Sequence, residues 1–105
     1  MLRIHPKYKI LISYDLLPET YEKHYRFLRT EFVPGVRDLN IYMTDVQQTL
    51  WGEYPLRVAE FVAESLEIVR QGLDSEKFKT LEKKFIGYTL NYKRRVIPYR
   101  RGFQL

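Results

Sequence analysis

The 105-residue sequence contains no cysteine and only two histidines. Without cysteine there is no disulfide framework, no thiolate zinc site and no cysteine nucleophile. The two histidines, His5 and His24, do not stand at metal-ligand spacing, and the sequence has no glycine-rich phosphate loop. We therefore expect neither a metal site nor a nucleotide cofactor.

The sequence also lacks long apolar runs. No stretch of about 18 apolar residues occurs, and the segment Met1–Pro6 has neither the apolar core nor the cleavage site of a secretory signal. These absences favour a cytoplasmic protein that does not enter a membrane. Because the chain is short and 45% hydrophobic, it has room for one core, and we expect a single domain over residues 1–105.

The formal net charge of +5 is concentrated near the C-terminus. Aromatic residues are interspersed with basic ones over residues 93–105. The basic residues of this segment are Lys93, Arg94, Arg95, Arg100 and Arg101. Such a segment could dock on an acidic carrier protein, or it could pack across a partner subunit as an aromatic tail. No nucleic-acid-binding motif accompanies it, which argues against nucleic acid as the partner.

Apolar residues that alternate with a period of two predict strands. In the first strand, for example, Ile10, Ile12 and Tyr14 share one face. A long connection over Gln47–Pro55 is expected between the second and third strands. The predicted strands are Tyr8–Leu17, Asp38–Val46, Leu56–Glu64 and Tyr88–Ile97.

Apolar residues at helical spacing predict the helices. The first helix opens at Pro18-Glu19 and stops at Pro34-Gly35, and the stripe expected to pack on the sheet is Tyr21, Tyr25, Leu28 and Phe32. The second helical region has two pieces, each capped by a serine or an aspartate. These pieces are Ser65–Arg70, which ends at Gly72, and Asp74–Ile86, which ends at Gly87.

The order strand, helix, strand, strand, helix, strand predicts a ferredoxin-like α+β fold. Right-handed crossovers then give a four-stranded antiparallel sheet with the helices on one face. The other face would carry apolar side chains from several strands. Sheet-to-sheet pairing of two copies would cover it, so we expect a homodimer.

The residues resemble the dimeric α/β-barrel superfamily, which includes the EthD-like, stress-responsive barrel and antibiotic-biosynthesis monooxygenase groups. The resemblance spans nearly the whole chain. Its carriers are the Tyr14-Asp15-Leu16 strand end, the Tyr21-Glu22-Lys23-His24-Tyr25 helix start, Pro34-Gly35-Val36, and Arg57–Ser65. It implies a homodimeric α/β barrel.

The Tyr-Asp-Leu opening and the Glu-Lys-His-Tyr helix are also similar to RedY-like proteins of prodiginine pathways. That resemblance implies a role in the bipyrrole branch, on a small aromatic or carrier-bound intermediate. The histidine usual on the first helix of EthD-like proteins is replaced here by Leu28 or Arg26, depending on the alignment. His24 is then the only substitute.

Two residues are candidates for acid–base chemistry. His24 borders the predicted buried stripe, where it could be a general base or a packing residue. Glu60 stands between Val58 and Val62, so its carboxyl could orient an imidazole or a substrate N–H. Alternatively, Glu60 forms a salt bridge with Arg57 or, across the dimer, with an arginine of the C-terminal tail.

A further group of residues is suited to binding a planar ligand. The tyrosines could line a pocket or belong to the core and interface, and Trp51 could be a lid or a dimer anchor. Asn40 could bind a ligand or favour a turn. The candidate binding residues are Tyr14, Tyr25, Asn40, Tyr42, Trp51 and Tyr88.

Three functions remain open at this stage. The protein could bind a small aromatic or pyrrolic intermediate and assist its conversion without a cofactor, with His24 as base. It could be a non-catalytic module that shelters or delivers such a compound. It could also be a basic docking protein for an acidic carrier domain.

Overall fold

The computed structural model describes residues 4–51 and 54–100, and the side chains of 49–51 and 54–55 are excluded from the description. The strands are β1 (Tyr8–Leu16), β2 (Tyr42–Trp51), β3 (Tyr54–Ala63) and β4 (Thr89–Pro98). The helical elements are η1 (Pro18–Thr20), α1 (Tyr21–Phe27), η2 (Leu28–Phe32), α2 (Val33–Arg37), α3 (Leu66–Asp74) and α4 (Glu76–Gly87).

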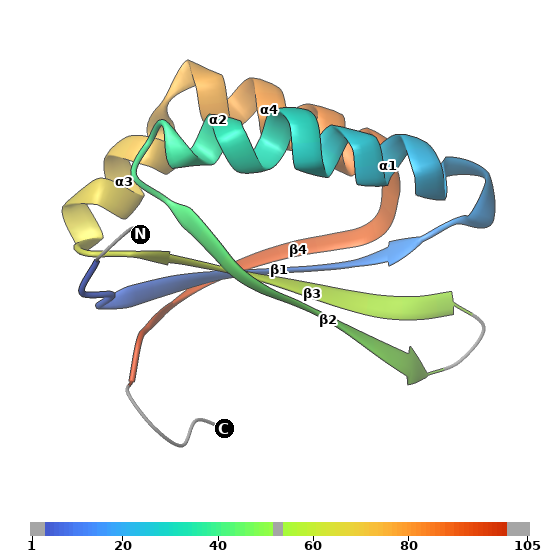
Figure 1. Ribbon diagram of the computed structural model, residues 1–105, viewed down its shortest axis with the longest axis horizontal. Coiled ribbons are helices and arrows are strands. Elements are labelled where there is room, and N and C mark those ends of the chain that lie inside the picture. Colours follow the sequence, from blue (N-terminus) through green and yellow to red (C-terminus); the bar gives the residue numbers. More distant parts are fainter. Residues whose placement is uncertain (1–3, 52–53, 101–105) are drawn as a thin grey trace.

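The strands form one antiparallel sheet in the order β2-β3-β1-β4, and the helices lie together on one of its faces (Figure 1). The predicted ferredoxin-like α+β fold is therefore confirmed. The connection from β1 through the first helices leads to β2, with β3 between them in the sheet. Two interleaved crossovers of this kind put both chain halves on the same sheet.

The core lies between the sheet and the helices. In β1, Ile10, Ile12 and Tyr14 point into it, as the period-two pattern predicts. Cross-strand pairing places Ile10 opposite Phe61 and Ile12 opposite Ala59, so the two central strands present one apolar surface. Large aromatic side chains from α1, η2 and α4 complete the core: Phe27, Phe32, Phe78 and Phe85.

The first helical region differs from its prediction in two ways. Pro34-Gly35 does not end it, because η2 is a wide π turn in which the Val33 N–H bonds to the Leu28 carbonyl, and α2 then continues to Arg37. Pro34 is tolerated because it lies in the first turn of α2, where its missing N–H is not needed.

The buried face of this region was also predicted wrongly. Tyr21 and Tyr25 are 43% and 50% exposed, whereas His24 and Phe27 are buried. Of the four residues predicted to pack on the sheet, only Leu28 and Phe32 are buried.

The connection between β2 and β3 is shorter than predicted, and β2 begins later than predicted. β2 and β3 extend to Trp51 and Tyr54, which pair with each other, so the expected long connection Gln47–Pro55 is wrong. Paired backbone groups satisfy their hydrogen bonds in a ladder, which a long loop would leave to solvent. The predicted start of this strand at Asp38 is wrong too, because a turn containing Asn40 at φ 64° precedes β2.

The second helical region confirms both predicted caps. The Ser65 hydroxyl accepts a hydrogen bond from the Ile68 N–H, and the Ser75 hydroxyl accepts one from the Phe78 N–H, both at 3.1 Å. The first piece does not end at Gly72, however. This glycine lies inside α3, where a Cβ would come 2.8 Å from the Ile41 side chain, so close packing explains it.

The open face of the sheet is mixed rather than apolar. Leu11, Val58 and Ile97 alternate with charged neighbours such as Lys9 and Arg95. The apolar side chains expected on this face are therefore present, but every strand also contributes charged side chains at outward-facing positions. Within the described part of the chain, no helix is long and apolar enough to cross a membrane.

Candidate functional site

His24 belongs to α1, and its side chain points from this helix into the core. Its side chain is 0% exposed, and its ring centroid is 5.0 Å from that of Tyr14 and 4.9 Å from that of Phe85. Neither ring nitrogen has a hydrogen-bond partner among the described residues. Burial and, to a smaller extent, the positive charge of Arg57 lower the pKa of His24 from 6.5 to about 4, so the imidazole is neutral at pH 7.

Tyr14 points toward the same place from near the C-terminal end of β1. It is fully buried, and its hydroxyl has no hydrogen-bond partner in the described part of the chain. Burial raises the pKa of Tyr14 to about 12, while the charge of Arg57 and the approach of its guanidinium toward the hydroxyl, which falls short of hydrogen-bond geometry, act in the opposite direction. The phenol therefore stays protonated and retains an O–H to donate.

Arg57 is the cross-strand neighbour of Tyr14, so its side chain enters the core side of the sheet from β3. One terminal nitrogen donates to the Tyr21 hydroxyl at 3.2 Å and to Gln48 Oε1 at 3.0 Å. The guanidinium also stacks on the Tyr21 ring at 5.0 Å. Its Nε is buried and has no partner within the described ranges.

These three residues form what we name the Arg57 cluster: Tyr14, His24 and Arg57. Among the described residues, every buried side-chain nitrogen or oxygen without a hydrogen bond belongs to this cluster. Such atoms are costly in a core because they lose water and gain no partner. Their convergence at one place, from α1, β1 and β3, marks this place as the candidate site.

Glu60 lies on the opposite face of the sheet from His24, so the structure does not bring these two candidates together. Its carboxylate contacts Lys9 at 3.4 Å and accepts a hydrogen bond from the Thr44 hydroxyl at 2.9 Å. Within the chain its charged partner is therefore Lys9 and not the expected Arg57, and the bridge to a tail arginine across a dimer stays a prediction. Glu60 thus belongs to a polar network on the open face.

Neither of the two remaining tyrosine candidates on the helix side belongs to the cluster. Tyr25 is half exposed and stacks with Arg29 at 5.5 Å. Tyr88 lies at the end of α4, where its ring is 5.5 Å from that of Phe27. It is thus part of the aromatic core beside the cluster.

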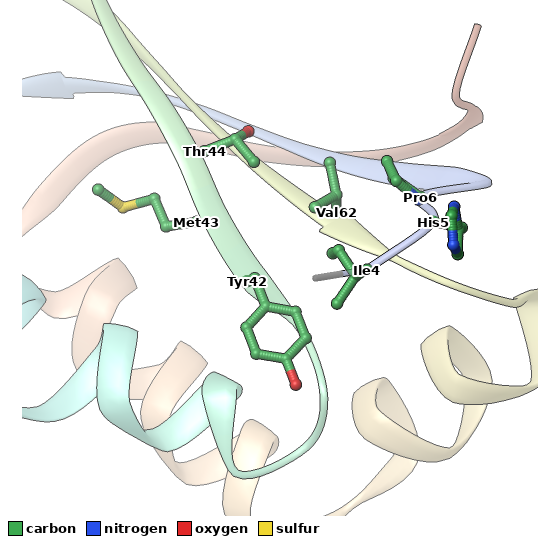
Figure 2. A pocket seen from close by; sticks show the side chains of 7 residues that line it. All are labelled: Ile4, His5, Pro6, Tyr42, Met43, Thr44 and Val62. Atoms are coloured by element: carbon green, nitrogen blue, oxygen red, sulfur yellow. The ribbon is translucent and has the colours of Figure 1, made fainter. Parts of the chain in front are cut away.

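Tyr42 lines a pocket of about 570 Å³ on a different part of the sheet (Figure 2), and its hydroxyl faces the Asn40 side chain. The Tyr42 hydroxyl and the Asn40 side chain are 3.4 Å apart. The pocket lining, which includes Tyr42 but not Asn40, is mainly apolar: Ile4, His5, Pro6, Tyr42, Met43, Thr44 and Val62. The hydroxyls of Tyr42 and Thr44 already have partners, so this pocket offers little unsatisfied chemistry.

The Trp51 side chain, expected as a lid or an anchor, lies outside the described residues. Within the described ranges, no group of three or more histidine, cysteine, aspartate or glutamate residues could hold a metal ion.

The sequence interpretation identified Tyr14 and His24 but missed Arg57 as a site residue. A signal was available, because Arg57 has the same strand parity as Ala59, Phe61 and Ala63, which are all buried. A charged residue at a core-facing position is unusual enough to mark a functional candidate. Tyr21 and Gln48, which hold Arg57, could be identified only after the strand register was known.

The fold is that of a large group of small ferredoxin-like α+β proteins. No family model matches the chain, and no curated protein is significantly similar to it in sequence. Solved structures are similar in fold.

One of these is a NIPSNAP family protein of unknown function from Agrobacterium tumefaciens, with 10% identity, a TM-score of 0.64, and coverage of 95% of this chain and 96% of that chain. Another, named as a candidate antibiotic biosynthesis monooxygenase from Deinococcus radiodurans, has 8% identity, a TM-score of 0.71, and coverage of 93% and 97%. A third, with a similar name and from Nitrosomonas europaea, has 11% identity, a TM-score of 0.62 and 93% coverage of both chains. At these identities the likeness establishes the fold alone.

Proposed function

We propose that this protein binds a small aromatic or pyrrolic intermediate of secondary metabolism in the Arg57 cluster and assists its conversion by cofactor-free acid–base chemistry. The observation that carries the proposal is the convergence of the unpaired buried polar atoms of Tyr14, His24 and Arg57. A ligand bearing both polar groups and a flat ring would satisfy these atoms and pack against the neighbouring aromatic side chains.

In this proposal His24 is the proton acceptor. Its neutral imidazole offers one acceptor nitrogen and one N–H donor. A ligand O–H or N–H that faces the acceptor nitrogen would be held for proton removal. The anion formed in that step would lie close to the Arg57 guanidinium, which would stabilise it electrostatically.

A non-catalytic binding role is the second candidate, and one observation favours it. With a pKa of about 4, His24 is a weak base at neutral pH, whereas efficient general bases have pKa values near the working pH. In the binding role, His24 would only accept a hydrogen bond from a labile compound that the protein shelters or delivers.

The variant His24→Gln separates the two roles, because glutamine keeps hydrogen-bonding capacity but cannot take a proton. The test is pathway output in a producing strain in which this variant replaces the wild-type gene. Loss of output, with the protein still folded by circular dichroism, supports catalysis. Unchanged output supports binding alone, provided that Tyr14→Phe reduces output.

The pathway itself is a separate proposal. The resemblance to RedY-like proteins and the names of the monooxygenase-like neighbours favour secondary metabolism, and the prodiginine bipyrrole branch is the specific expectation. Deletion of the gene in a pigment-producing host should reduce the bipyrrole half of the pigment and leave the other half unchanged. A host that makes normal pigment without the gene would contradict the assignment.

We also propose that the protein is a homodimer whose open sheet faces pair. Leu11, Val58 and Ile97 would be buried there, and the Lys9–Glu60 pair would remain satisfied within each subunit. Sedimentation equilibrium at micromolar concentration should give twice the mass of the 12.8 kDa chain. A well-folded monomer under these conditions would contradict the dimer.

A further inference from the structure

We infer that the Arg57 cluster takes its ligand as an anion, with a carboxylate or an ionised phenol or enol oxygen held by the Arg57 guanidinium and the Tyr14 hydroxyl. This inference rests on the proposed function, because it names the chemical class of the ligand for the same site. It is carried by the balance of donors and of charge around the cluster.

The unpaired atoms of the cluster are rich in hydrogen-bond donors. Arg57 Nε is a donor only, and the protonated Tyr14 hydroxyl also has an O–H to donate. His24 adds one N–H donor, and its other nitrogen is the one strong acceptor that the cluster leaves unpaired. The missing partner must therefore supply acceptor atoms, which an anionic oxygen does best.

The charge balance leads to the same ligand. The observed acceptors of Arg57, the Tyr21 hydroxyl and Gln48 Oε1, are both neutral. Among the described residues, no carboxylate lies within ion-pair distance of Arg57. A guanidinium whose Nε is buried without a counter-ion carries a desolvation cost that an anionic ligand would offset.

Other partly buried cations of this protein do have carboxylate partners. Arg94 Nε donates to Glu82 at 2.6 Å, and Lys9 is 3.4 Å from Glu60. Arg57 differs from both in position as well as in pairing, because it lies beside the unpaired atoms of Tyr14 and His24. The absence of a carboxylate is thus a property of this cluster and not of the whole chain.

The surrounding rings restrict the shape of the anion. Phe85 lies 4.9 Å from both the Tyr14 and the His24 rings, at interplanar angles of 81° and 77°. A planar ring bearing the anionic oxygen would keep its flat surface against these side chains and its charge toward Arg57.

The test compares ligands that differ only in charge. Pyrrole-2-carboxylate and pyrrole-2-carboxamide form one pair, and benzoate and benzamide form another. Calorimetry and NMR titration of the wild-type chain at pH 7 should show that each carboxylate binds at least about tenfold more tightly than its amide, which equals about 1.4 kcal/mol. The pKa of His24 should rise on carboxylate binding, because a negative charge would then lie next to the imidazole.

Three arginine variants locate the effect. Arg57→Gln should remove the preference for the carboxylate while amide binding stays within about twofold of wild type, a difference of less than about 0.5 kcal/mol. Arg70→Gln removes the same charge from an exposed position in α3, away from the proposed dimer face, and should leave the preference intact. Arg57→Lys keeps the charge and should retain part of the preference, which covers the case in which Arg57→Gln fails to fold.

The outcomes separate the inference from the proposed function. Equal binding of both members of a pair would overturn the anion inference and leave the binding function standing. A preference that survives in Arg57→Gln would overturn the role of Arg57. If neither member of either pair binds at about 10 mM, which corresponds to less than about 3 kcal/mol of binding free energy, both the inference and the proposed function fail.

Discussion

The burial of His24 predicts a specific loss of stability between neutral and mildly acidic pH. In the folded protein the pKa of His24 is about 4, whereas in the unfolded chain it returns to 6.5. Between these values the unfolded state binds a proton that the folded state does not. The contribution of neutral His24 to the free energy of unfolding is therefore fully present above pH 6.5, and it is lost as the pH decreases toward 4.

The size of this loss follows from the two pKa values. Each unit of separation corresponds to about 1.4 kcal/mol, and linkage gives a loss of about 2 kcal/mol in the free energy of unfolding between about pH 7 and pH 5. Most carboxylates remain ionised over this interval, so they contribute little to it. The Tyr14 phenol beside the imidazole has a pKa of about 12 and does not titrate there either.

Urea unfolding at several pH values measures this loss directly. His24→Gln should remove most of the pH dependence between pH 7 and pH 5, although it lowers stability at pH 7 through lost packing. His5→Gln is the matched control, because His5 is exposed and its removal should leave the wild-type slope. A wild-type slope that persists in His24→Gln, or an NMR titration of His24 near pH 6.5, would refute the reasoning.

Other substitutions test the packing of the fold by chemical denaturation. Phe85→Ala should cost about 3–5 kcal/mol, since this fully buried ring contacts aromatic neighbours on several elements; a loss below about 1 kcal/mol would mean that the core is not packed as described. Ser75→Ala should cost about 1 kcal/mol, because the Phe78 N–H loses its cap, and unchanged stability would contradict that capping role. Tyr92→Phe should cost at most about 1 kcal/mol, because the Glu82 carboxylate that its hydroxyl contacts keeps a second partner; a much larger loss would show that the hydroxyl, and not that partner, anchors Glu82.

Much of the fold could be predicted from short-range patterns. The alternation through Ile10, Ile12 and Tyr14 predicts β1 correctly because one face of that strand packs on helices, so burial follows the period of two. The serine caps of α3 and α4 are similarly local, because each hydroxyl bonds to an N–H three residues ahead. The helix stop at Pro34 was wrong because the same dipeptide fits the first turn of a continuing helix.

The candidate site could be predicted only in part. Tyr14 and His24 were identified from residue type and predicted element, and the structure places their rings in contact. Arg57 was missed because charged residues are normally assigned to the surface. The partner of Glu60 could not be foreseen, since Lys9 is 51 residues away in sequence and the contact depends on strand register.

The wide turn at η2 decides which side chains enter the core. A regular α-helix that places His24 inward would next direct positions near 28, 31 and 35 toward the sheet, since its period is about 3.6 residues. The wide turn contains one extra residue, which shifts the inward-facing positions after it by one. Phe32 and Val36 are therefore buried. Glu31 is thereby left in solvent, where it pairs with Lys84 at 2.8 Å. One additional residue in a single turn thus exchanges a carboxylate for a phenyl ring at the centre of the protein.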